Sequence, residues 1–244
     1  MNWRELLYRD YSANFGGGKS YDAARQWASY DVVYAARLPA NEQLKIADLG
    51  CGKGEWLQWM GQRGFVDRTG VDLSESDLAV ARMNDATVKW VDGNLMEFLR
   101  SRSGEFDIVH AKDVVEHFTK EEFIEFLVLC ERALRPGGQL WLLTYNAQSP
   151  LAGMTRYGDF THEIGLTPAS MAQCLRACGF SKVKVDGFHY CSRSLGGRLR
   201  DWIGRLFYFA GRFALKVRHG GAEAMDGVDQ YNAQPDLFAI SVKV

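Results

Sequence analysis

Short apolar runs that end in acidic or polar residues recur through the first 145 residues of the chain. The clearest runs are Ile46–Leu49, Thr69–Leu73, Thr87–Val91, Phe106–His110 and Gln139–Tyr145. A turn at Leu134–Gly138 is expected to end the helix before the last of these runs. Segments with helical periodicity lie between them, so strands and helices alternate along the chain. Hydrophobic strands that alternate with helices predict a parallel sheet covered by helices on both faces. The expected fold class is therefore α/β.

The end of the chain adds two expected strands, Lys182–Phe188 and Leu237–Val244, separated by residues 189–236. This separation far exceeds a hairpin loop of about 2–5 residues. Within it, the apolar residues of 198–218 fall on one continuous face of a helical wheel. Basic residues border that face, with Arg198, Arg205, Arg212 and Lys216 on one edge and Arg200 and Arg218 on the other. Such a helix either packs on the sheet or a partner subunit, or lies on an anionic membrane.

The first 40 residues are expected to be helical, with a break at Gly16–Gly18 and many aromatic side chains. One interpretation is a helical layer packed on the core. The other is a lid over a ligand cleft, hinged at the glycines, which places Tyr11 near the substrate.

Composition narrows the class of protein. The chain has 244 residues, of which 47% are hydrophobic and 24% charged, as in an ordinary soluble globular protein. Its net charge of −1 provides no general attraction to nucleic acid. The five cysteines form no C-x-x-C pair, which favours reduced thiols over disulfides or zinc. We find neither a secretory signal nor an apolar run of about 18 residues, so a cytoplasmic location is expected.

A glycine turn follows the first strand, where Asp48 precedes Gly50, Gly52 and Gly54. Glycines let a ligand approach the backbone, and the helix that follows offers unpaired N–H donors. Asp72 ends the next strand, 22 positions after Gly50, where an acid can bind both ribose hydroxyls. The alternative for Asp72 is a role in capping the helix that begins nearby. The turn and acid together predict a nucleotide-like ligand, without separating NAD from S-adenosylmethionine.

The turn resembles the first motif of class I S-adenosylmethionine-dependent methyltransferases, and four later segments within 46–145 match the same family. The resemblance implies a Rossmann-like fold of seven strands, of which only the last is antiparallel. It also implies that Asp48 and the glycine turn hold the methionine end of the cofactor, and that Asp72 and Asp92 hold its ribose and adenine. Other implied cofactor contacts are Leu73, Gly93, Asn94 and Ala111.

The acceptor is expected beyond the fifth strand, because ligands bind outside the carboxyl ends of the strands in such sheets. Residues 156–163 there resemble an Arg-Tyr-Gly-Asp-x-Thr-His-Glu element of methyltransferases associated with bacterial surface-polysaccharide biosynthesis. The implied reaction is O-methylation of a sugar hydroxyl, or a phosphate, in a surface glycan or its precursor. The alternatives are a lipid or quinone-like acceptor and, in another class, a non-catalytic nucleotide-binding subunit. His110–Asp113 replaces the Asn/Asp-Pro-Pro-aromatic run of enzymes that methylate base amines, which argues against such a substrate.

Catalytic roles follow from which side chains can move a proton. An alcohol must lose its proton, so a histidine or carboxylate within hydrogen-bond reach is needed. We expect His162 to be the general base, with His117 as the second choice. Asp159 would orient His162 or bind sugar hydroxyls, and the expected substrate contacts are Arg156, Tyr157 and Glu163. No metal is expected, because Asp113 and Asn146 do not form the acidic triad of magnesium-dependent relatives.

We therefore expect one domain spanning residues 1–244. Its parts are a lid (1–40), a cofactor core (41–145), a substrate loop and helix (146–188), an amphipathic insertion (189–236) and a last strand (237–244). The expected partners are a saccharide or lipid-linked glycan substrate, an anionic membrane through residues 198–218, and a second copy of the chain. A membrane contact would make the protein peripheral on the inner face of the cytoplasmic membrane.

Overall fold

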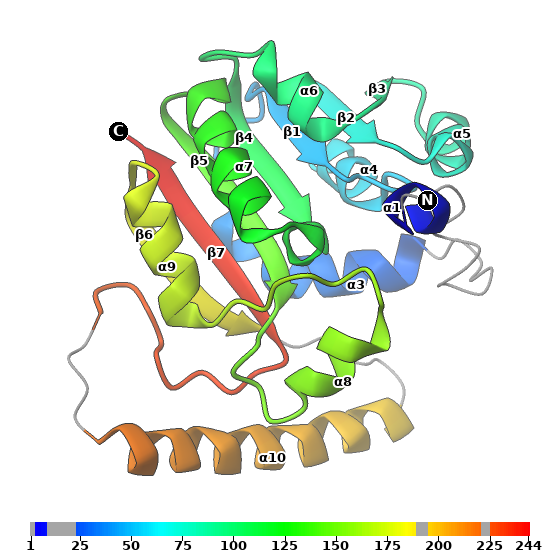
Figure 1. Cartoon of the computed structure of the whole chain (residues 1–244). Coiled ribbons are helices and arrows are strands. Elements are labelled where there is room, and N and C mark those ends of the chain that lie inside the picture. Colours follow the sequence, from blue (N-terminus) through cyan, green and yellow to red (C-terminus); the bar gives the residue numbers. More distant parts are fainter. Residues whose placement is uncertain (1–2, 9–22, 189–194, 221–224) are drawn as a thin grey trace.

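The computed structural model describes residues 3–8, 23–188, 195–220 and 225–244. Its sheet has seven strands in the order β3-β2-β1-β4-β5-β7-β6 (Figure 1). The strands are β1 (Ile46–Leu49), β2 (Arg68–Asp72), β3 (Lys89–Asp92), β4 (Phe106–Lys112), β5 (Leu134–Tyr145), β6 (Phe180–Phe188) and β7 (Asp236–Lys243). The first five pair in parallel, whereas β7 is antiparallel to both β5 and β6. The expected methyltransferase-like topology is confirmed.

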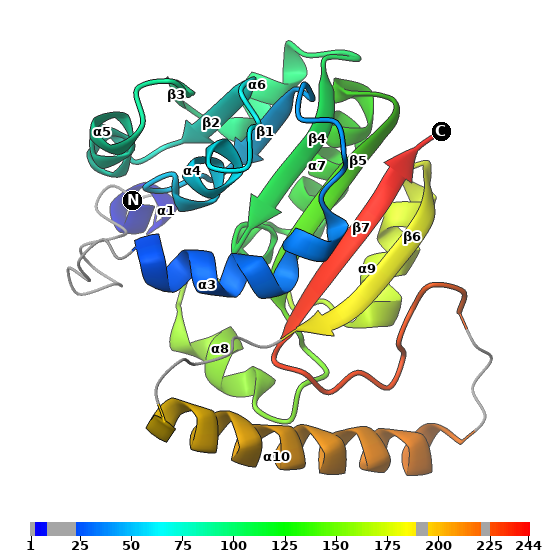
Figure 2. The same cartoon turned by 180° about the vertical axis from the view of Figure 1, so that it is seen from behind.

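Helices cover both faces of this sheet. They are α1 (Trp3–Tyr8), α3 (Ala23–Val33), α4 (Glu55–Gly61), α5 (Glu75–Asn84), α6 (Leu95–Arg100), α7 (Lys120–Ala133), α8 (Ala152–Gly158), α9 (Pro168–Ala177) and α10 (Leu195–His219), with 3₁₀ turns η1 (Ala35–Arg37) and η2 (Val115–His117). Helices α6, α7 and α9 lie on one face, and α3 and α4 lie on the other (Figures 1 and 2). Helix α10 lies apart from the sheet, below α8 in both views.

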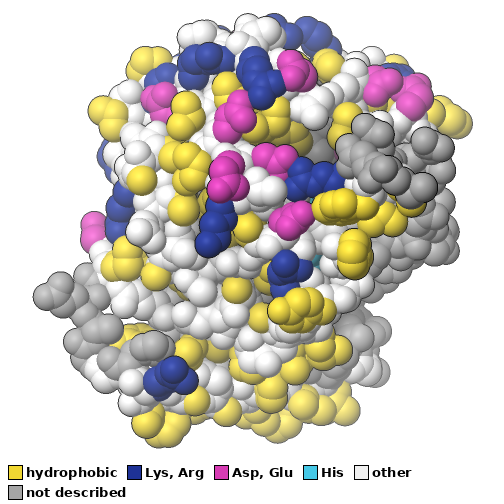
Figure 3. Space-filling view, viewed as in Figure 1, with side chains coloured by type: hydrophobic (Ala, Val, Ile, Leu, Met, Phe, Trp, Pro, Cys, Tyr) yellow, Lys and Arg dark blue, Asp and Glu magenta, His cyan; other side chains and the backbone are white. Residues whose placement is uncertain are grey.

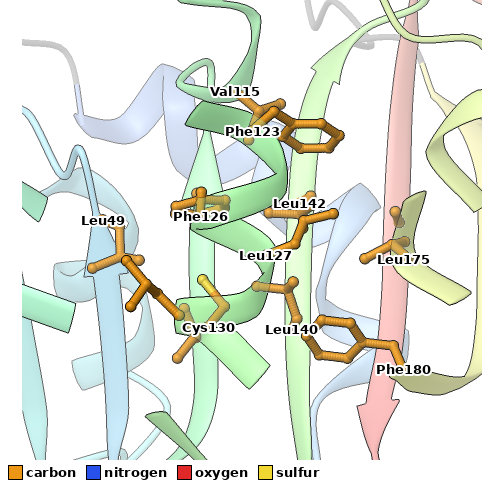
Figure 4. Close-up of a cluster of buried hydrophobic side chains, with 14 of the residues drawn as sticks. Leu49, Val115, Phe123, Phe126, Leu127, Cys130, Leu140, Leu142, Leu175 and Phe180 are labelled. Carbon is orange, nitrogen blue, oxygen red and sulfur yellow. The ribbon is translucent and has the colours of Figure 1, made fainter. Parts of the chain in front are cut away.

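The strands divide their side chains between two hydrophobic clusters, because successive residues of a strand point to opposite faces. Leu140 and Leu142 join the cluster under α6, α7 and α9, which Figure 4 shows with Phe126 and Leu127 of α7. Trp141, which lies between the two leucines, packs in the cluster on the α3 and α4 side. This double burial explains why β5 is hydrophobic from Leu140 to Leu143. The cysteines of the described residues are free thiols, and Cys191 lies outside these residues.

One predicted turn is absorbed into a strand. Residues 134–138 were expected to separate a helix from the fifth strand, but β5 begins at Leu134, which already pairs with Phe106. The register then shifts, because the next pair joins Ile108 to Gln139. Pro136 has no N–H to donate, and Gly137 has φ of 78°. The intervening residues therefore form an irregularity within β5 and leave the ladder intact on either side.

Candidate active site

The turn between β1 and α4 forms an open cradle. Gly50 and Gly52 have φ of 72° and 51°, a left-handed conformation that residues with a Cβ rarely adopt. A Cβ on Gly50 would lie 2.4 Å from Cγ2 of Val114, whereas one on Gly52 would meet nothing within 4 Å. The backbone N–H groups of Gly50 and Cys51 both donate to the carbonyl of Val71, which fixes the turn on the end of β2. Open space therefore lies beside the backbone at Gly52.

Carboxylates lie near the ends of three strands at this edge. Asp48 is the next-to-last residue of β1, whereas Asp72 ends β2 and pairs in register with Asp92, which ends β3. The two oxygens of Asp72 accept from the N–H groups of Gly52 (2.7 Å) and Ser74 (2.8 Å). Burial raises the pKa of Asp72. The N-cap of α5 is Ser74, so Asp72 shapes the cradle and does not cap the helix.

Asp48 is held by a buried network that the sequence analysis missed. Its Oδ1 lies 2.7 Å from Nδ1 of His110, whose Nε2 lies 2.8 Å from the hydroxyl of Tyr34. The His110 ring also stacks on Trp56, with centroids 3.9 Å apart. Asp48 and His110 are register partners on adjacent parallel strands. That pairing of β1 with β4 is the signal that could have predicted the contact.

A second polar group lies where η2 meets the loop after α8. The rings of His117 and His162 are 4.8 Å apart between centroids. The hydroxyl of Thr161 donates to Oδ1 of Asp159 (2.7 Å) and lies 2.9 Å from Nδ1 of His117. A hydroxyl has one hydrogen, so it must accept from the N–H at Nδ1 of His117. This arrangement leaves Nε2 of His117 as the nitrogen that can take up a proton.

His162 is set in the same tautomer by a different partner. Its Nδ1 lies 2.9 Å from the carbonyl oxygen of Thr155, which can only accept, so Nδ1 carries the hydrogen. Nε2 of His162 lies 3.9 Å from Oδ2 of Asp159, and the ring stacks on Tyr145. Both histidines therefore present Nε2 as a proton acceptor.

Burial controls the charge of this group. It raises the pKa of Glu116 to about 8, helped by the negative charge of Asp113, while the hydroxyl of Thr144 donates to Oε2 of Glu116 at 2.9 Å. Burial and then the charge of His162 lower the pKa of His117 to about 4. At neutral pH, Glu116 is therefore protonated and His117 is uncharged.

Helix α1 packs against this second group. Arg4 donates to Oε1 of Glu122 (2.5 Å) and to the carbonyl of His117 (3.4 Å). The ring of Tyr8 lies 6.0 Å from that of His117, and Trp3 contacts Phe160 edge-on. The N-terminal segment thus covers the histidines from one side. Tyr11, the lid residue expected to meet the substrate, lies outside the described residues.

The three other residues expected to bind substrate have distinct surroundings. Arg156 donates to the backbone carbonyls of His162 and Glu163, so its guanidinium holds the loop in shape. Tyr157 is 82% exposed, and Glu163 lies 3.6 Å from Arg4. A role for these three in substrate binding stays a prediction.

Comparison with known proteins shows what the chain is similar to. Residues 46–138 match a family model described as a methyltransferase domain. A ubiquinone biosynthesis O-methyltransferase of Acinetobacter baumannii (strain AYE) is 25% identical over 162 residues, 60% of this chain and 67% of the relative. The enzyme of the same name from Pseudomonas aeruginosa (strain UCBPP-PA14) is 33% identical over 106 residues, 42% of this chain and 44% of the relative. A SAM-dependent methyltransferase structure from Archaeoglobus fulgidus has a TM-score of 0.68 at 20% identity, covering 96% of this chain and 98% of that one.

Residues 46–138 are therefore a methyltransferase domain, and the sheet has the fold of S-adenosylmethionine-dependent methyltransferases. This match supports an enzyme over a non-catalytic nucleotide-binding subunit, and S-adenosylmethionine over NAD as the cofactor.

The edge of the sheet fits this cofactor. The open space beside Gly52 admits a ligand to the backbone, and the carboxylates of Asp72 and Asp92 follow it on adjacent strands. The remaining expected contacts lie around the same edge. Gly54 is the N-cap of α4, Leu73 is 59% exposed, the N–H of Gly93 donates to the carbonyl of Asp72, Asn94 caps α6, and Ala111 is buried in β4. The methyltransferase would hold the methionine end near Asp48 and the adenosine along Asp72 and Asp92.

Two further features of the methyltransferase bear on its ligands. Glu116, His117 and His162 offer ligand atoms that all lie within 4.8 Å of one another, as a metal site requires. A metal there would have to displace the proton that burial keeps on Glu116. A cavity of about 250 Å³, lined by Arg37, Phe188, Arg205, Phe238 and their neighbours, lies elsewhere, and none of the residues assigned to the site lines it.

Proposed function

We propose that this methyltransferase methylates a hydroxyl oxygen on a lipid-soluble, quinone-like ring compound. The observation that carries the acceptor class is the similarity, over 162 residues, to a relative named for O-methylation in ubiquinone biosynthesis. The paired histidines support a hydroxyl as the acceptor. S-adenosylmethionine supplies a methyl group that is already activated on a sulfonium, so the remaining task of the protein is to remove the proton that a hydroxyl loses on methylation.

The two histidines would share the proton of the acceptor. Removal of a proton by a positioned side chain contributes about 10²–10⁴-fold to the rate. The carboxylate of Asp159 lies 3.9 Å from Nε2 of His162 and would orient the ring. Burial and the charge of His162 both lower the pKa of His117. We therefore propose His162 as the base and His117, positioned by Thr161, as its partner.

A surface glycan is the second acceptor class. The motif in residues 156–163 supports it, whereas the relatives described above are named for ubiquinone biosynthesis. A sugar hydroxyl or phosphate would meet the same histidines, so the geometry of the proton acceptors does not separate the two classes. The similarity to the relatives favours the quinone-like acceptor.

A methyl-transfer panel tests the acceptor class. Purified protein with radiolabelled S-adenosylmethionine would be given prenylated catechols, nucleotide sugars and lipid-linked oligosaccharides, and the label would be counted in each product. We expect kcat/KM for a prenylated catechol to exceed that for any saccharide by about 10²-fold or more. Label found in saccharides alone would overturn the proposal in favour of the glycan. The His162→Ala variant serves as the control for uncatalysed transfer.

A further inference from the structure

Helix α10 turns its apolar side away from the protein. Eight large hydrophobic side chains of this helix are exposed; they are Leu199 (61%), Trp202 (59%), Ile203 (55%), Leu206 (52%), Phe207 (44%), Phe209 (71%), Phe213 (64%) and Val217 (68%). We call these residues the outer face of α10. Figure 3 shows hydrophobic side chains gathered along the lower edge of the molecule, where the helix lies. This excludes the interpretation in which the stripe packs on the sheet.

The opposite side of α10 makes the contacts with the rest of the chain. A Cβ on Gly211 would lie 2.8 Å from Cγ of Pro150 and 3.2 Å from Cβ of Ala233, so this glycine allows a close approach. Arg212 forms an ion pair with Asp229. The helix is therefore seated by its small and polar side, and its outer face is left for something outside the described chain.

Charge indicates what lies against this face. Helix α10 contains six Lys and Arg residues and a single acid, Asp201, in a chain whose net charge is −1. Lys216 and Arg218, which border the outer face, are both exposed. An anionic surface complements this pattern, since apolar side chains enter the acyl region while basic ones meet phosphates. A second copy packed face to face would instead bring two basic helices together.

We propose that the outer face of α10 docks on an anionic lipid bilayer, with the helix lying in the plane of the headgroups. No helix of the described residues is both long and apolar enough to cross a membrane, so the contact is interfacial. Pro150, against which α10 packs, lies between β5 and α8, in the segment that leads on to His162. Docking therefore brings the substrate loop to the membrane surface. The inference stands on α10 alone and holds for either acceptor class.

Vesicle sedimentation tests the docking without any acceptor. Binding would be measured to vesicles of phosphatidylglycerol with phosphatidylcholine and to phosphatidylcholine alone, at low and high salt. We expect binding to the anionic vesicles that weakens with salt. Phe209→Ser with Phe213→Ser should abolish it. Lys216→Gln with Arg218→Gln should weaken it about 30-fold at low salt, from about 1 kcal/mol for each charge. Arg212 is left unchanged because it pairs with Asp229.

Matched controls lie at the far edge of the sheet. Met83→Ser removes an apolar side chain that is 88% exposed on α5, and Arg82→Gln with Lys89→Gln removes two charges there. These variants should bind vesicles like the wild type. Equal binding to neutral vesicles, or α10 variants that sediment like the wild type, would overturn the proposal. A dimer in light scattering that the Phe209 and Phe213 substitutions dissociate, without vesicle binding, would assign the face to a second copy instead.

Discussion

Glu116 and His117 are adjacent residues that burial drives to the same uncharged state. The pKa of the acid rises to about 8 and that of the base falls to about 4. The backbone of Glu116 also accepts from the N–H groups of Glu163 and Ile164, so it ties the loop that carries His162 to η2. One short segment therefore sets both the position and the charge of the candidate proton acceptors.

The protonated state of Glu116 makes stability depend on pH. Folding raises its pKa from 4.5 to about 8, so between these values the folded state keeps a proton that the unfolded chain has released. Stability should then fall as the pH rises through this window, by at most roughly 1.4 kcal/mol per pH unit. Glu116→Gln cannot ionise, so its urea stability relative to the wild type should increase from pH 5 to pH 8. The exposed Glu125→Gln serves as the control, and a difference that is flat with pH would show that Glu116 is ionised.

Asp72 should contribute directly to cofactor affinity. Asp72→Ala removes a carboxylate proposed to bind the ribose, and hydrogen bonds to a charged group contribute about 1.5–3 kcal/mol. We expect Kd for S-adenosylmethionine to rise about 10- to 150-fold in titration calorimetry. The exposed Asp67→Ala is the matched control. Because Asp72 also holds the N–H of Gly52, melting without ligand would show whether the turn itself is lost. Unchanged affinity would remove Asp72 from the site.

The two histidines can be separated by single substitutions. His162→Ala should lower kcat by about 10²–10⁴-fold while leaving cofactor affinity nearly unchanged, because it removes the proton acceptor alone. Thr161→Val should reduce kcat less, since it frees the His117 ring from its hydrogen bond without removing a nitrogen. If His117→Ala abolishes turnover and His162→Ala does not, the base is His117.

For single residues, the sequence pointed to the carboxylates of the site but did not predict their hydrogen-bond partners. Asp72 and Asp92 were found from their places after apolar runs, and the structure sets them in register. The link from Asp48 to His110 and Tyr34 joins residues 62 and 76 positions apart, and no local pattern encodes it. Which histidine faces the acceptor depends on side-chain packing for the same reason.

At the scale of elements, periodicity predicted each strand and the long helix, but it did not predict which side of that helix packs against the protein. The apolar stripe of α10 has the spacing of a core helix, yet it is exposed because Gly211 and Arg212 seat the other side. The turn at 134–138 was misplaced because the ladder resumes across Pro136, which is a tertiary effect. The type of an element therefore follows from the local sequence pattern, whereas the buried side of a helix and the register of a strand follow from packing.

Helix α1 offers a test at this scale, because Arg4 holds it to Glu122 beside the histidines. The pair is partly exposed, so it should contribute no more than about 1 kcal/mol. Arg4→Ala should raise KM for the acceptor about two- to fivefold and leave Kd for S-adenosylmethionine unchanged. Arg100→Ala breaks a comparable pair with Glu125, which lies on α7 as Glu122 does. This pair is away from the site, so the substitution should leave KM unchanged. A change in cofactor affinity would contradict a lid that covers only the acceptor.

For the whole molecule, the glycine cradle and the histidine pair lie at the carboxyl edge of one sheet, where together they would form one active site. Both groups follow the ends of parallel strands, as ligand sites do in open α/β sheets. The docking of α10 would set this edge against a membrane, which suits a lipid-soluble acceptor.

The most direct test is a crystal structure with S-adenosylhomocysteine and a prenylated catechol. We expect the adenosine beside Gly52 and Asp72, with the sulfur facing the histidine pair. The acceptor hydroxyl should lie within about 3.2 Å of Nε2 of His162 or His117 and in line with the sulfur. A sulfur that faces away from both histidines, or a catechol bound in the cavity between Arg37 and Arg205, would contradict this arrangement.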